Sequence, residues 1–261
     1  MSVRLALAGD TGTVRAGEAE TAAFLGRLLR WDKAAVVRLR SAPGEPALGV
    51  FGQPPFGGVL AVKSMALSGP GVDGQVDATV SAGELLEAVA TAVDGGEFTV
   101  PGSVTGPAWA GLLPPRSHWR RDAELDAALV REAAARTVAE FRARTEALVP
   151  EQRTRAGLDA LAEELWRRPL THTGGGGTEV PLRVVHAAHA LGFLRPGPPA
   201  GDPAAARERD SQGARGPEGS PRSPDTVAVL TAGPWLRLRT AYGSVAMRVA
   251  SAASGLTVSP L

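Results

Sequence analysis

The sequence predicts an α+β fold, in which a small sheet with two helices precedes a helical unit that carries a β-hairpin. Three observations favour it. Short apolar runs alternate with helical patterns in the first half, three amphipathic helices follow, and β-rich sequence resumes after a long segment without large apolar residues. The 261 residues, 44% of them hydrophobic, are enough to build a sizeable core.

The first half is predicted to be an α+β domain over residues 1–118. Strand candidates are Val3–Ala8, Ala35–Arg40, Leu48–Phe51, Val59–Lys63, Val76–Val80 and Glu97–Val100. The first helix is expected over Glu18–Trp31, where apolar side chains recur at helical spacing. Ser81 and Glu84 form a capping box for the second helix, which a pair of glycines ends at Gly95.

Residues 119–194 are predicted to form a helical unit. A long helix is expected over Asp122–Leu148, with its first residue as the N-cap. A second helix is expected over Gln152–Arg168, and the proline between them favours an antiparallel pair. The third helix is expected over Pro181–Leu191, followed by a glycine cap.

Residues 195–225 contain seven Pro and five Gly and no Val, Ile, Leu, Met, Phe, Tyr or Trp. Such a segment buries too little apolar surface to offset its conformational entropy, so a disordered insert is predicted. Residues 226–261 then complete the C-terminal unit with a hairpin of Val227–Thr231 and Trp235–Thr240, and Val245–Val249 is a candidate third strand.

Composition narrows the function classes. The chain has no Cys, which excludes disulfides, a cysteine nucleophile and thiolate metal sites. Its net charge is +1, a weak basic excess for a nucleic-acid binder. No apolar run reaches the 18 or so residues of a membrane span, and the first residues lack a signal-peptide core. We therefore expect a cytoplasmic protein without a membrane partner, metal or cofactor.

His118 is the most enzyme-like single residue, because it lies in the irregular, aromatic-rich segment Pro101–Trp119. It could act as a general base oriented by Asp10, Asp32 or Asp122, whose proximity a sequence does not reveal. The tripeptide that begins at Asp10 also occurs in aspartic proteases, but their chemistry needs a second carboxylate and this chain has no second copy. His118 and Asp10 are thus candidate catalytic residues, with structural roles as the simpler alternative.

His186 and His189 lie three apart on the third helix of the helical unit, so they share a face. Two imidazoles can bind a metal, but no third ligand follows at a recognisable spacing, so burial with ordinary partners is the favoured interpretation. The four glycines at 174–177 precede the same helix. Whether this loop binds an anion or only connects two helices stays open.

The order of helix, helix and hairpin in the C-terminal half resembles a winged-helix domain. In that family the last helix enters the major groove and the hairpin contacts phosphates. The resemblance implies nucleic-acid-binding roles for Arg183, His186 and His189 on the helix and for Arg237 and Arg239 on the hairpin. A structural helix and hairpin is the alternative.

The segments LLRWDKAAVVRL, GVFGQPPFGGVLAV, GPAWAGLLPPRSHW and LRLRTAYGSVAMR together resemble an uncharacterised protein type of GC-rich actinobacteria. The resemblance implies no activity. The sequence leaves three hypotheses: a non-catalytic interaction or regulatory protein with a protein partner, a DNA-binding regulator that uses the winged-helix-like unit, and an enzyme with a general-base histidine.

Overall fold

The computed structural model describes residues 3–8, 11–68, 74–92, 96–171, 178–196 and 225–249, with the backbone alone for 11–16. The predicted insert lies almost wholly outside these residues. The glycines at 174–177 and the candidate Asp10 lie outside them as well.

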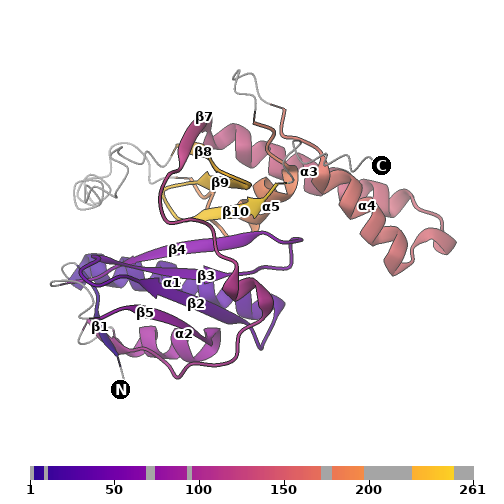
Figure 1. Cartoon of the computed structure of the whole chain (residues 1–261). Coiled ribbons are helices and arrows are strands. Elements are labelled where there is room, and N and C mark those ends of the chain that lie inside the picture. The colour runs from indigo at the N-terminus through magenta and orange to yellow at the C-terminus, as the bar shows by residue number, and fades with distance from the viewer. Residues whose placement is uncertain are drawn as a thin grey trace, which may run out of the picture.

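One eight-stranded antiparallel sheet runs through the body (Figure 1). In sheet order its strands are β5 (Val76–Ser81), β2 (Val36–Ser41), β3 (Ala47–Gly52), β4 (Leu60–Ala66), β10 (Ser244–Arg248), β9 (Trp235–Arg239), β8 (Thr226–Ala232) and β7 (Arg120–Asp126). Strand β10 pairs with β4, with Val245 opposite Ala61, so both halves of the chain share the sheet.

The structure confirms an α+β fold but corrects its arrangement. A separate small sheet and a winged-helix-like C-terminal unit were expected, and both expectations are wrong, because the hairpin β8–β9 is built into the eight-stranded sheet. A second, two-stranded sheet joins β1 (Arg4–Ala6) to β6 (Glu97–Thr99).

The helices are α1 (Thr11–Trp31), α2 (Ala82–Thr91), α3 (Ala127–Ala147), α4 (Arg155–Arg167) and α5 (Leu182–Ala190). Helices α1, α2 and α5 cover one face of the sheet, and a single buried core joins them to it. The antiparallel pair α3–α4, which we call the arm, extends away from the sheet (Figure 1). No helix of the described ranges is long and apolar enough to span a membrane.

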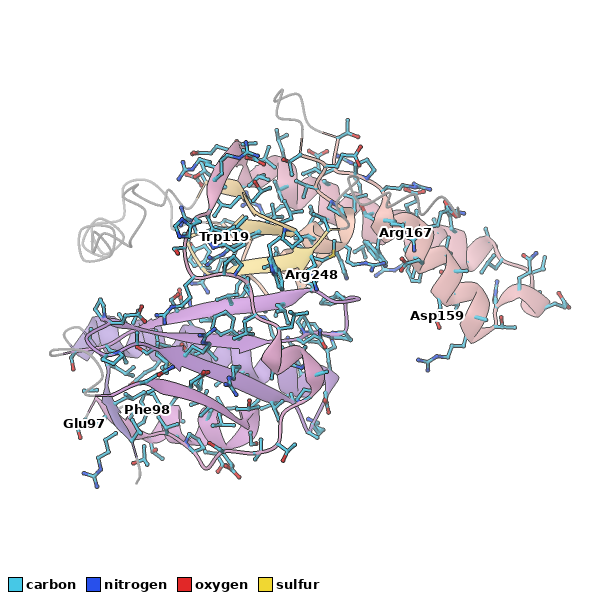
Figure 2. All side chains as sticks on the ribbon, in the orientation of Figure 1. Glu97, Phe98, Trp119, Asp159, Arg167 and Arg248 are labelled. Carbon is cyan, nitrogen blue, oxygen red and sulfur yellow. The ribbon has the colours of Figure 1, made fainter. Side chains whose placement is uncertain are left out.

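Side chains alternate across the strands, as the two-residue period of a strand requires. On β9, Leu236 and Leu238 point into the core beneath the helices. Arg237 therefore points to the opposite face, which a strap over residues 100–119 crosses, with a short 3₁₀ helix at Ala108–Gly111. Trp119 of the strap (Figure 2) packs there against a small cluster of Leu60, Trp235 and Ala246.

The start of α3 differs from the prediction. Residues Arg120–Asp126 form the edge strand β7, so Asp122 is not the helix cap. Asp126 caps α3 instead, and its Oδ1 accepts hydrogen bonds from the N–H groups of Ala128 and Leu129 at 2.6 and 3.2 Å. The cap of α2 is confirmed, because the Ser81 hydroxyl accepts a hydrogen bond from the Glu84 N–H at 3.4 Å.

Candidate functional site

Five rings from five elements form a row where the N-terminal half meets the arm. The ring centroids of successive members lie 5.2, 5.0, 4.2 and 6.2 Å apart. We call this set the aromatic row; its members, in spatial order, are Trp31, Phe56, His186, Trp166 and Phe141. The first two contacts are edge-to-face, and the imidazole is stacked on the Trp166 ring with 22° between the planes. Such contacts stabilise beyond the apolar area that they bury.

The row depends on the loop between β3 and β4, which carries Phe56. Arg183 of α5 holds this loop by donating a hydrogen bond to the Gly57 carbonyl at 3.4 Å. The same guanidinium forms an ion pair with Glu163 of α4. Gly57 has φ +58°, and a Cβ there would lie 2.5 Å from Arg183 Nη1, so glycine allows the close approach. Arg183, one of the nucleic-acid-binding candidates of the sequence, thus joins the loop to α4 and α5.

Burial sets the charge of the central ring. Burial, followed by the charge of the nearby His189, lowers the pKa of His186 from 6.5 to about 4. His186 is therefore neutral at pH 7 and stacks as an uncharged ring. Its Nδ1 is buried and has no hydrogen-bond partner in the described part of the chain. His189 is exposed. Within the same residues, no group of three His, Cys, Asp or Glu could hold a metal ion.

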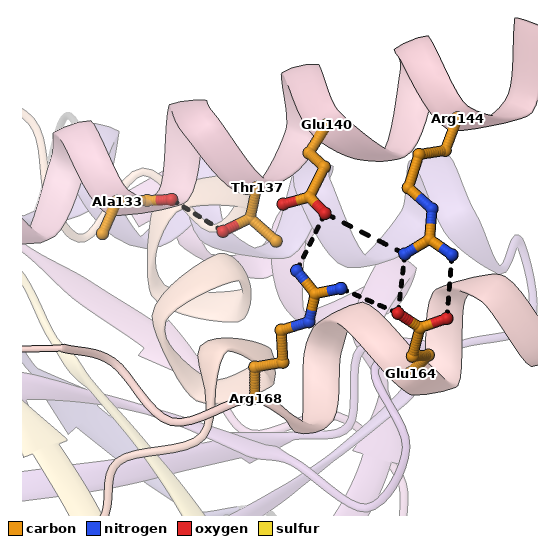
Figure 3. A network of polar contacts seen from close by, with 6 residues as sticks. All are labelled: Ala133, Thr137, Glu140, Arg144, Glu164 and Arg168. Carbon is orange, nitrogen blue, oxygen red and sulfur yellow. Dashed lines mark hydrogen bonds and ion pairs between the residues drawn. The ribbon is translucent and has the colours of Figure 1, made fainter. Parts of the chain in front are cut away.

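The arm is fixed beside the row by a network of ion pairs (Figure 3). Arg144 of α3 contacts Glu164 of α4 at 2.6 Å, and Arg168 contacts Glu140 at 2.8 Å and Glu164 at 2.7 Å. These contacts keep α3 and α4 in register, so Phe141 and Trp166 face one another. Trp31, at the opposite end of the row, is 38% exposed, and the other four rings are half-buried. The row therefore reaches the surface.

Among the described residues, His118 does not contact the acids that were expected to orient it. His118 is exposed in the strap and has φ +66°, a left-handed conformation that few non-glycine residues adopt. The Asp32 carboxylate accepts a hydrogen bond from the Ala34 N–H in the turn after α1. Asp122 accepts hydrogen bonds from Thr178 and Thr231. Among the described residues, no hydrogen bond joins His118 to either acid.

The predicted nucleic-acid-binding residues lie on opposite faces of the sheet. Helix α5 packs on the covered face through Val184 and Val185. Arg237 and Arg239 alternate with core residues, so they point to the face that the strap crosses, where Arg237 lies 5.4 Å from the centroid of the Trp119 ring. The described geometry therefore places the α5 residues and the two hairpin arginines on opposite faces of the sheet and not on one shared surface.

A cavity of about 470 Å³ lies between the end of α1, the start of β2 and the strap. Its lining includes Leu28, Asp32, Val36, Gln53, Pro107 and Trp109. Asp32 is the one ionisable side chain in this lining, and His118 does not contribute to it. General acid–base catalysis by two side chains would need a second ionisable group, which this lining does not contain.

The sequence did not predict the aromatic row, because its members are scattered between positions 31 and 186. One signal was present. The chain has only 5 Trp, 1 Tyr and 6 Phe, and two of these rings lie where a core residue is not expected, at a helix end (Trp31) and in a Pro/Gly-rich loop (Phe56).

Comparison with solved structures gives low similarity. The beta subunit from DNA polymerase of Streptococcus pyogenes matches with a TM-score of 0.44 and 9% identity over 95% of this chain and 64% of that one. The beta subunit of DNA polymerase III from Thermotoga maritima matches with a TM-score of 0.42 and 10% identity over 95% of this chain and 64% of that one. The C. crescentus beta sliding clamp matches with a TM-score of 0.45 and 13% identity over 100% of this chain and 69% of that one. The chain thus spans 64% of the length of the first two, and the likeness is too low to support a conclusion.

No curated protein matches the chain. Two family models match it in succession. Residues 10–111 match a Domain of unknown function (DUF8010), and residues 114–252 match a Domain of unknown function (DUF8185). The boundary between the two falls in the strap, although β4 and β10, one from each region, are hydrogen-bonded neighbours. Because the second model covers more than half of the 261 residues, the chain belongs to the DUF8185 family.

Proposed function

We propose that this chain is a cytoplasmic, non-catalytic interaction protein that binds a protein partner through the aromatic row and the adjoining arm. One observation carries the proposal: the five rings form a continuous row that is partly exposed, with Trp31 38% exposed at one end. Aromatic residues, Trp above all, are enriched among the residues that dominate binding energy in protein interfaces.

The row is also held rigidly before any partner arrives. Neighbouring rings support one another, and the ion pairs of Arg183 and Arg144 fix the loop and the arm on either side. A rigid surface loses less conformational entropy on binding, which favours affinity. Because the row spans five elements and lies outside the cavity, its extent suits a protein surface better than a small molecule.

The test removes one ring at each end of the row. Trp31→Ala and Phe141→Ala, singly and together, should reduce the amount of a captured partner at least about tenfold, because an aromatic residue that dominates an interface contributes about 2 kcal/mol or more. The measurement is quantitative mass spectrometry of proteins cross-linked to the purified full chain in cell extract. Circular dichroism would verify that each variant is folded.

The matched control is Leu112→Ala, which removes an apolar side chain that is 50% exposed on the strap and is not a member of the row. Capture should be unchanged in this variant. A partner retained equally by wild type, the double variant and the control would contradict the proposal, because its binding would not involve the row.

A further inference from the structure

The segment that follows α5 runs antiparallel along α1. Gly192 lies against Arg27, since a Cβ at this glycine would be 2.6 Å from Arg27 Nη2. Phe193 stacks on Phe24 with ring centroids 5.9 Å apart. Glu20 forms an ion pair with Arg195. On α1, positions 20, 24 and 27 share one face, so the contacts form a continuous seam.

Four arginines surround this seam. Arg27 and Arg30 lie one turn apart on α1, and Arg195 ends the seam. Arg131 reaches it from α3 and donates a hydrogen bond to the Leu194 carbonyl at 3.2 Å. We call Arg27, Arg30, Arg131 and Arg195 the arginine cluster.

Carboxylates do not balance these charges. Glu20 forms ion pairs both with Arg195 and with the buried Lys63. Within the described part of the chain, Arg27, Arg30 and Arg131 form no ion pair with a carboxylate. The arm shows the opposite arrangement, in which Arg144, Arg167 and Arg168 all contact glutamates.

Repulsion between the charges of the cluster affects the pKa of Arg27. Burial lowers the pKa of Arg27 below its usual value, and the charges of Arg30 and Arg195 lower it further. Like charges three residues apart on a helix destabilise it. An anion placed among these side chains would relieve the repulsion and provide the missing hydrogen-bond acceptors.

We propose that the arginine cluster binds a chain of phosphoryl groups, either a free polyphosphate or the backbone of a nucleic-acid strand. Guanidinium groups suit phosphate oxygens because they donate two parallel hydrogen bonds. Positions 20 and 27 are two helical turns apart, about 10.5 Å along the axis, so the cluster is longer than one phosphate. The guanidinium of Arg195 is oriented by the Tyr242 ring, 3.7 Å below it.

The test uses fluorescence anisotropy with a labelled single strand of about 12 nucleotides, a length within the usual range of single-strand sites, and calorimetry with sodium tripolyphosphate. Wild type should bind at least one probe. For the strand, three unpaired cations predict a slope of about −2 for log affinity against log salt. Arg27→Ala/Arg131→Ala should weaken binding at least about tenfold, and Arg27→Lys should weaken it less than Arg27→Ala, because Lys keeps the charge but loses the two parallel N–H donors.

Arg155→Ala is the control, since this arginine is 94% exposed at the far arm. It should bind both probes as wild type does. Binding of tripolyphosphate alone would identify a free polyphosphate as the ligand, and binding of the strand with the expected salt slope would identify nucleic acid. Binding of neither probe, or the same loss in Arg155→Ala as in the double variant, would overturn the proposal. Thermal unfolding of each variant separates lost binding from lost structure.

Discussion

Arg144 on α3 and Glu164 on α4 form a two-pronged ion pair, with Nη1–Oε1 and Nη2–Oε2 distances of 2.6 and 2.9 Å (Figure 3). Hydrogen bonds from Arg144, and then from Arg168, lower the pKa of Glu164 to about 2, against an ordinary value of 4.5. The pair is solvent-exposed, so its effect on global stability is small and screened by salt. Its local role is to keep the two helices of the arm in register.

Acid should therefore weaken the contacts between the two helices of the arm. A carboxyl group whose pKa is lower in the folded than in the unfolded state stabilises the fold above its unfolded pKa, and this stabilisation is lost as pH falls through the folded pKa. For Glu164 the window runs from about 4.5 down to about 2. A carboxyl ¹³C titration should show the low pKa in wild type and a rise toward 4.5 in Arg144→Ala. Arg136→Ala, whose partner is Glu132, should leave the Glu164 titration unchanged.

His186 should make stability depend on pH in a second window. Burial, followed by the charge of His189, lowers its pKa from 6.5 to about 4. Between these values the unfolded chain binds a proton that the folded chain does not, so stability falls as pH drops from 6.5 to 4. His186→Phe keeps a ring in the row but removes the titration. Urea unfolding at pH 7 and pH 5 should show a smaller difference for this variant than for wild type, and equal differences would contradict the assignment.

The two regions matched by separate family models should unfold together. Their strands β4 and β10 are neighbours in one sheet, and Leu238 lies fully buried in a core that also contains Leu39. Leu238→Ala should cost about 2–5 kcal/mol of unfolding free energy, whereas Leu112→Ala, 50% exposed, should cost little. Two separate transitions in urea, with only one shifted by Leu238→Ala, would show that the halves are independent.

Local sequence predicted most elements, because their signals lie within a few residues. The apolar runs at β2, β3 and β4 and the capping box before α2 are such signals, and the structure confirms these elements. The edge strand β7 was mistaken for a helix start, since its sequence RRDAELD is charged and pairs on one side only. Charged residues are common on edge strands, where they discourage pairing with other chains.

Longer-range features could not be derived in this way. The pairing of Ala61 with Val245 joins residues far apart in the chain, and no local pattern specifies it. The aromatic row could not be predicted for the same reason, since its rings come from four helices and one loop that only the tertiary fold brings together. Arg183 was noticed as a basic residue on α5, but its contacts with Gly57 and Glu163 depend on a loop and a helix that only the tertiary fold brings to it.

Two glycines should respond to alanine in opposite directions. Gly26 lies inside α1, and a Cβ there meets nothing within 4 Å, so Gly26→Ala should stabilise by about 0.5–1 kcal/mol. Gly192 has φ +71°, a left-handed conformation that costs about 1–2 kcal/mol for a residue with a Cβ. Gly192→Ala should therefore destabilise by that amount, mainly through the backbone, because the Arg27 side chain that a Cβ would meet can move. The stability of Gly192→Asn should lie between those of wild type and Gly192→Ala, since Asn tolerates the left-handed conformation better than Ala does. Urea unfolding of the three variants checks the order, and a Gly192→Ala variant as stable as wild type would show that position 192 does not need the left-handed conformation.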